Sequence, residues 1–96
     1  MSGHIQHHQD NFRGAFQYWL DGEKLAEMVY VMAGSERMII DHTEVDDRLR
    51  GQGIGVLLLE ALIDHVRTMS ISVIPLCPFA KTTLAKHPGW QDVLAG

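Results

Sequence analysis

The feature that most constrains this chain is a glycine-rich loop, Arg50-Gly51-Gln52-Gly53-Ile54-Gly55, between an apolar strand-like segment and an apolar helix-like segment. Alternating glycines leave the backbone free of Cβ atoms and permit positive φ. The helix that follows would offer unpaired N–H groups and the positive end of its dipole, which together attract anions. Arg50 adds a guanidinium suited to phosphate. The loop is therefore predicted to bind a pyrophosphate, and the alternative is a turn that only joins strand to helix.

Two common phosphate-binding loops do not match these residues. A Walker loop ends in Gly-Lys-Ser/Thr, whereas Gly55 is followed by Val56-Leu57. The dinucleotide fingerprint requires glycine at its sixth position, and counting from either Gly51 or Gly53 places an aliphatic residue there. The pattern that remains is Arg-x-x-Gly-x-Gly.

Composition limits the class of protein. The chain has 96 residues, of which 46% are hydrophobic, so residues 1–96 are expected to form one small domain. A net charge of −4 argues against broad nucleic-acid binding. The single cysteine, Cys77, suits a reducing compartment, and neither a signal peptide nor a membrane-length apolar run is seen, so a cytoplasmic location without membrane contact is expected. The six histidines lack metal-ligand spacing, and no metal site is expected.

The amino-terminal half is predicted to be an antiparallel meander. Residues 12–20 and 25–32 have strand character, and Asp21-Gly22 between them is a strong hairpin signal. A third strand is expected over residues 38–45, and residues 4–8 are expected to form a short edge strand.

The carboxyl-terminal half is predicted to contain a strand–helix–strand crossover. Apolar residues recur at helical spacing over 54–69, and the β-branched run 71–76 predicts a strand parallel to the one before the helix. A short helix over 79–87 is expected to end at Pro88-Gly89. The fold class is therefore α+β, an α/β sandwich.

The pattern Arg50-x-x-Gly53-x-Gly55, placed between a strand and an amphipathic helix, resembles the pyrophosphate loop of the GNAT superfamily of CoA-dependent N-acyltransferases. The segments 41–45 (Asp-His-Thr-Glu-Val) and 76–81 (Leu-Cys-Pro-Phe-Ala-Lys) narrow the resemblance to minimal single-domain GNAT-like proteins of about this size. The resemblance covers nearly the whole chain. It implies a minimal GNAT fold, a site for CoA or acetyl-CoA, and direct transfer of acetyl from CoA to an amine acceptor that the resemblance does not define.

The resemblance also implies a use for Pro75. In GNAT proteins two central strands diverge into a V that admits the pantetheine arm; the alternative is an ordinary proline at a strand end or edge. Carried over residue by residue, it implies a cofactor site formed by Thr43, Val45, Arg50, Gly51, Gln52, Gly53, Ile54, Gly55, Cys77, Phe79, Ala80 and Lys81.

Three residues are candidates for the chemistry. Strict strand alternation places Ile40, His42 and Glu44 on one face, with Asp41, Thr43 and Val45 on the other. Histidine is a common general base and Glu44 could orient His42 or act through water, so either residue is a candidate base; the alternative is two solvated strand residues. Cys77 is a candidate acyl relay or an apolar lining residue near the thioester.

Larger GNAT enzymes carry two helices between their first two strands, and residues 12–45 offer only hairpin-like strands here. The acceptor side is therefore expected to be open. An open side favours a large acceptor such as a protein or peptide amine, and equally a CoA-binding module with no acceptor. A small protein–protein interaction domain that binds no nucleotide is the third possibility.

Overall fold

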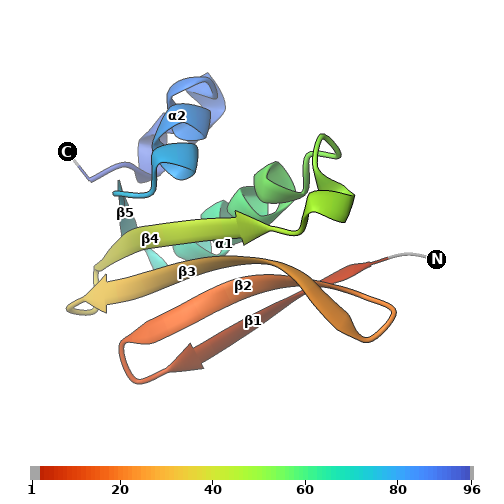
Figure 1. Cartoon of the computed structure of the whole chain (residues 1–96). Helices are drawn as coiled ribbons and strands as arrows, with labels where there is room; N and C mark the ends of the chain where they lie inside the picture. The colour runs from red at the N-terminus through yellow and green to blue at the C-terminus, as the bar shows by residue number, and fades with distance from the viewer. Residues whose placement is uncertain (1–2, 96) are drawn as a thin grey trace.

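The computed structural model describes residues 3–95. Five strands form one sheet in the order β1-β2-β3-β4-β5, in which β1 to β4 are antiparallel neighbours and β5 runs parallel to β4 (Figure 1). This is the predicted meander followed by a crossover. The elements are β1 (His4–Asp10), β2 (Arg13–Leu20), β3 (Glu23–Ala33), β4 (Arg37–Val45), the 3₁₀ turn η1 (Asp47–Leu49), α1 (Ile54–Met69), β5 (Ser72–Pro75), α2 (Pro78–Ala85) and the 3₁₀ segment η2 (Pro88–Val93).

Local sequence signals explain several of these boundaries. Asp21 and Gly22, with φ of 53° and 79°, form the predicted two-residue turn between β2 and β3. The predicted edge strand exists and extends to Asp10. The last helix spans Pro78–Ala85 rather than 79–87. It begins at Pro78 because proline suits the first helical position.

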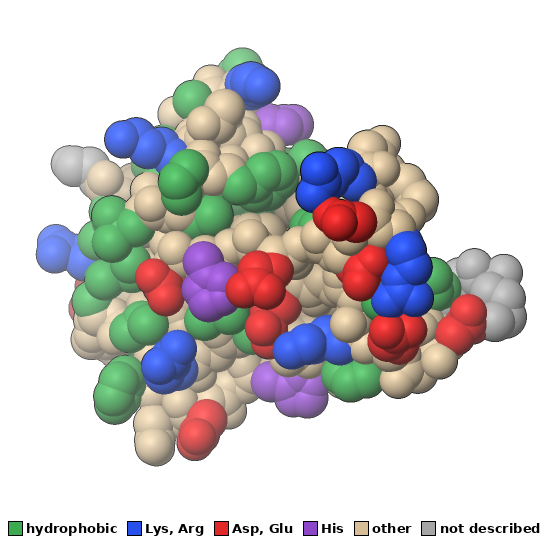
Figure 2. All heavy atoms as spheres, viewed as in Figure 1, with side chains coloured by type: hydrophobic (Ala, Val, Ile, Leu, Met, Phe, Trp, Pro, Cys, Tyr) green, Lys and Arg blue, Asp and Glu red, His purple; other side chains and the backbone are tan. Residues whose placement is uncertain are grey.

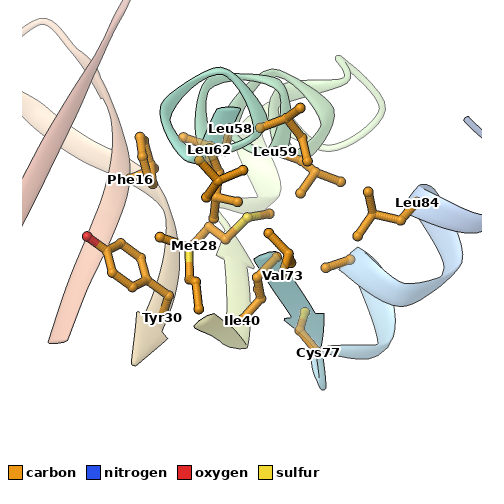
Figure 3. Packing of buried hydrophobic residues seen from close by; sticks show 14 of the residues in the cluster. Phe16, Met28, Tyr30, Ile40, Leu58, Leu59, Leu62, Val73, Cys77 and Leu84 are labelled. Carbon is orange, nitrogen blue, oxygen red and sulfur yellow. The ribbon is translucent and has the colours of Figure 1, made fainter. Parts of the chain in front are cut away.

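Helix α1 occupies residues 54–69, as its periodicity predicts, and packs one apolar face on the sheet (Figure 3). Leu58, Leu62 and Val66 on that face are fully buried, and they meet buried residues of the sheet. Helix α2 adds its own apolar side to the same core through Ala80 and Leu84. The core therefore ties the crossover helix to all of the central strands.

A β-bulge changes the predicted facing of β4. His42 is paired with Val29 and Ile40 with Tyr30, so Asp41 is an extra residue in the ladder. The expectation that Ile40 shares a face with His42 and Glu44 is therefore wrong. Ile40 is fully buried, and beyond the bulge it is Thr43 and Val45 that turn toward the core. His42 and Glu44 do share a face, the exposed one.

The face of the sheet turned toward the viewer in Figure 1 is covered by no helix. The only connection between β1 and β2 is the short turn at Asn11-Phe12, so nothing in the described chain is inserted there to cover this face. Within residues 3–95, no helix is long and apolar enough to cross a membrane.

Two histidines lie where β1 meets α1. His7 stacks on Phe16 with ring centroids 4.1 Å apart, and its Nε2 lies 2.6 Å from the Tyr30 hydroxyl. The His65 ring meets His7 edge-on at 4.5 Å. Burial lowers the pKa of His7, and the neighbouring rings of His65 and His8 lower it further. Burial also lowers the pKa of His65.

These histidines predict that the fold loses stability in mild acid. A lowered pKa in the folded state means that the unfolded chain binds protons first, so the stabilisation is fully present above pH 6.5 and is lost as the pH falls below that value through the folded pKa. We expect the melting temperature to fall from pH 8 to pH 5, and to fall less steeply in His7→Gln/His65→Gln. The exposed residue His4 supplies the control His4→Gln, which should keep the wild-type slope. Equal slopes in all three proteins would contradict the assignment.

Candidate functional site

The strands β4 and β5 part at Pro75. Their register runs from Arg37–Ser72 to Ile40–Pro75 and then ends. The carbonyl of Ile40 accepts hydrogen bonds from the N–H groups of Leu76 and Cys77, at 3.1 and 3.0 Å. Beyond this point β4 continues to Val45 while the chain after β5 turns into α2. Pro75 is thus a strand-end proline, and the strands also separate just beyond it.

Thr43 and Cys77 face each other across this separation. The Thr43 Oγ1 lies 3.3 Å from the Cys77 Sγ, and either atom can be the donor. Cys77 is only 3% exposed and directly precedes α2. In Figure 3 it lies where β5 ends and α2 begins. The structure therefore brings together two of the residues that sequence placed in the site.

The glycine loop presents the amino end of α1 as an open cradle. Gly51 and Gly53 have φ of 82° and 75°, in the left-handed region that favours glycine, and a Cβ on either would meet nothing within 4 Å. Gly53 is the residue before the first helical turn, no side chain caps this end, and the first turn contains no acid. The first N–H groups of α1 are therefore available to an anion.

Gly55 serves a different purpose from the other two glycines. A Cβ at this position would lie 2.6 Å from Cζ of Phe79, at the start of α2. The missing side chain therefore makes room for the Phe79 ring, which is 38% exposed. The sequence predicts one role for all three glycines. In the structure Gly51 and Gly53 allow the backbone to turn, whereas Gly55 makes room for the Phe79 ring.

A hollow of about 210 Å³ opens between these elements. Its walls come from the end of β4, the loop, the first turn of α1 and the first turn of α2. The lining residues are Val45, Leu49, Arg50, Gly51, Gly53, Ile54, Gly55, Val56 and Phe79. Sequence reasoning did not include Leu49 and Val56, which are apolar residues immediately beside predicted ones.

Arginines on either side of Leu49 are engaged by carboxylates. The Arg50 guanidinium pairs with Asp47, and both side chains are at least 80% exposed. Arg48 binds Asp46 and Glu23, which fastens η1 to the β2–β3 turn. The Arg48 hydrogen bonds lower the pKa of Asp46 to about 2. Arg48 is thus a structural clamp, whereas the exposed Arg50 pair is weak enough for a phosphate to replace the carboxylate.

His42 lies between two carboxylates on the uncovered face. Its Nδ1 is 3.5 Å from an Asp41 oxygen and its Nε2 is 3.7 Å from a Glu44 oxygen, with all three side chains exposed. Acidic side chains flank a histidine near the centre of this face in Figure 2. Asp41 was not predicted as a partner, because alternation placed it on the opposite face. Within residues 3–95 no hydrogen bond links His42 to Cys77.

A second hollow, of about 220 Å³, lies on the other side of the β4 end and shares Val45 with the first. Glu44 and its cross-strand neighbour Glu27 contribute to its wall. Burial raises the pKa of Glu27, but hydrogen bonds from Gln17 and Lys24 outweigh burial and the net pKa is lowered. Glu27 was missed because its position opposite Glu44 depends on the strand register.

Three other predicted residues occupy distinct positions. Gln52 extends from the loop, and its side-chain amide donates to the Arg48 carbonyl at 3.3 Å. Ala80 is fully buried, so its side chain belongs to the core. Lys81 is exposed, and its N–H donates to the Cys77 carbonyl at 2.9 Å as part of α2.

Comparison with proteins of known structure finds the same architecture. A GCN5-like protein from Staphylococcus aureus is 35% identical with a TM-score of 0.71, over 95% of this chain and 88% of that one. A ribosomal-protein-alanine N-acetyltransferase from Brucella melitensis biovar Abortus 2308 is 20% identical with a TM-score of 0.69, over 91% of this chain and 64% of that one. A ribosomal-protein-S18-alanine N-acetyltransferase from Escherichia coli is 22% identical with a TM-score of 0.67, over 84% of this chain and 54% of that one.

The chain spans less than two thirds of the length of the Brucella and Escherichia coli proteins. At 20% and 22% sequence identity, the likeness to these two proteins shows a shared fold alone. The family model for GCN5-related N-acetyl-transferase matches residues 15–93, from the third residue of β2 to the end of η2. With this match and the 35% identity to the Staphylococcus aureus protein, the chain belongs to the GCN5-related N-acetyltransferase family.

Proposed function

We propose that the protein is an acetyl-CoA-dependent N-acetyltransferase that transfers acetyl to an amine on a large acceptor. The observation that carries this proposal is the uncapped end of α1, which opens into a hollow beside the gap between β4 and β5. An anion site next to a strand gap suits a molecule with a pyrophosphate at one end and an extended arm at the other. Its expected location is the cytoplasm.

In this proposal the loop binds the CoA pyrophosphate. The N–H groups of residues 51–55 and the Arg50 guanidinium hold the phosphates, with Gln52 at the rim and Ile54 anchoring the helix in the core. The empty space around Gly51 and Gly53 is consistent with close approach of an anion. Phe79, Ala80 and Lys81 contribute the first turn of α2, through the Phe79 ring, the backbone and the exposed ammonium.

The acyl end of the substrate would lie in the strand gap. The backbone of Thr43 to Val45 pairs with the pantetheine arm, and an N–H near Val45 stabilises the negative charge that develops on the carbonyl oxygen. Cys77 lies at the closed end of this gap, where its thiol can line the thioester or accept the acetyl group.

The acceptor amine must lose a proton before or during attack. His42, with Glu44 or Asp41 beside it, is the proposed base on the uncovered face. No helix of residues 3–95 covers this face, which favours a protein or peptide amine. The uncovered face equally favours the second candidate function, a CoA-binding module that transfers no acetyl group.

Thermal unfolding tests the cofactor site first. A ligand at about one hundred times its dissociation constant adds about 2.7 kcal/mol, which raises the melting temperature of a domain this small by about 10–20 °C. We expect CoA and acetyl-CoA to produce this shift in wild type and not in Gly53→Glu. Gly34→Glu is the matched control, because Gly34 has a φ of 78° and open surroundings in the β3–β4 turn. Absence of any shift at millimolar ligand would leave the protein-interaction domain as the surviving hypothesis.

Substitution of Gly55 tests whether the Phe79 ring shapes the hollow. The clash in Gly55→Ala falls on the outer end of an exposed ring, so the ring should move while the fold stays nearly as stable. CoA affinity should fall roughly tenfold, or about 1.4 kcal/mol, and Phe79→Leu should restore it in the Gly55→Ala background. Undiminished affinity in Gly55→Ala, measured by calorimetry, would show that the ring is not part of the site.

Acetyl transfer to a panel of amines and basic peptides separates enzyme from binding module. Loss of the base, in His42→Ala or in Glu44→Ala, should lower turnover by ~10²-fold or more while the CoA-dependent thermal shift persists, since general bases typically contribute 10²–10⁴-fold. Asp64→Ala is the control, an exposed ionisable residue on α1, on the covered side of the sheet. If both variants keep full activity, neither residue is the base. Unchanged turnover in Cys77→Ser would exclude an essential acyl-cysteine.

A further inference from the structure

Cys77 has one side-chain hydrogen-bond partner in residues 3–95, and that partner is the hydroxyl of Thr43. The sulfur otherwise belongs to the buried hydrophobic cluster, and hydrogen bonds hold the Cys77 backbone. The Cys77 N–H donates to the Ile40 carbonyl, and its own carbonyl accepts from the Lys81 N–H at 2.9 Å. The sulfur is therefore held at a fixed place, and a single side chain decides the polarity it meets there.

The bulge at Asp41 is what aims Thr43 at the sulfur. With regular alternation from Ile40, the Thr43 side chain would point to the uncovered face, away from Cys77. The extra residue in β4 reverses that facing, so Thr43 reaches the core side of the strand. Its β-branched side chain is stiff about χ1, which makes it suited to hold a contact at one position.

A hydroxyl suits this place because it can both accept and donate. A neutral thiol can donate its proton to Oγ1, and a sulfur that gains negative charge can accept the hydroxyl proton. A buried thiol in wholly apolar surroundings is inert, since nothing there stabilises its charged form. Thr43 supplies that missing donor without exposing the sulfur to water.

We propose that Thr43 is the positioning residue for Cys77, holding the sulfur at the closed end of the strand gap and donating a hydrogen bond as charge develops on it during acyl transfer. This inference rests on the proposed function. The Cys77 sulfur bonds to the acetyl carbonyl carbon, the bond to the CoA sulfur breaks, and the thiol proton leaves with CoA. The neutral acceptor amine then bonds to the same carbon, the bond to Cys77 breaks, and an amine proton returns to Cys77.

Infrared spectroscopy tests the contact without any turnover. The chain has one cysteine, so the S–H stretching band belongs to Cys77 alone and disappears in Cys77→Ser. Thr43→Val removes the hydroxyl at nearly constant shape and should shift the band to higher frequency, as for a thiol without a partner. Thr43→Ser should keep the wild-type position. Thr83→Val, at a buried threonine on α2, is the control that should leave the band in place.

Kinetics then test the role. Loss of one hydrogen bond to a charged atom is expected to lower kcat about tenfold in Thr43→Val. KM for acetyl-CoA and the CoA-dependent thermal shift should be unchanged, and Thr43→Ser should recover the rate. A band that does not move, an unchanged kcat, or equal loss of CoA binding would each overturn the proposal, as would full activity in Cys77→Ser. A wild type that binds CoA and acetylates nothing overturns the proposed function, while the infrared band still decides whether Thr43 holds the sulfur.

Discussion

The site depends on one constraint, the end of the parallel ladder at the Ile40 carbonyl. This carbonyl accepts from both the Leu76 and the Cys77 N–H, so the two donors that follow Pro75 converge on one acceptor and the pairing of β5 with β4 stops there. Five further residues of β4 then run on without β5 beside them. The end of this pairing opens the gap between β4 and β5. It also sets the position of Cys77 beside that gap and the direction in which the chain enters α2.

The gap matters because α1 packs across the same strands. Its buried face holds β4 and β5 in register up to Ile40, and the fixed length of the crossover presents the amino end of the helix beside the end of β4. Packing thus places the uncapped amino end of α1 close to the part of β4 that β5 does not pair. Neither feature requires a charged side chain in the core, and the described side-chain polar atoms that are buried all have partners.

Sequence alone could predict those parts of this arrangement that depend on signals between residues close together in the chain. The boundaries of α1 follow from its periodicity, the β2–β3 turn from Asp21-Gly22, and the parallel crossover from a strand on either side of the helix. The bulge at Asp41 has no local signature, because it arises from the register that β3 imposes on β4. The Thr43–Cys77 contact, the position of Asp41 beside His42 and that of Glu27 opposite Glu44 all depend on this register. They could be found only after the strands were aligned.

The Arg50–Asp47 pair bears on how an anion would be held at the loop. A phosphate that binds Arg50 must exchange places with a carboxylate, and the displaced Asp47 stays close enough to repel it. The net contribution of this arginine is therefore small, and most of the attraction falls to the neutral N–H dipoles at the start of α1. Fixed dipoles at short range are screened less by dissolved ions than exchange between exposed charges. An anion bound at this loop would thus be held mainly by backbone conformation, and its binding would tolerate ionic strength better than the two arginines of the segment suggest.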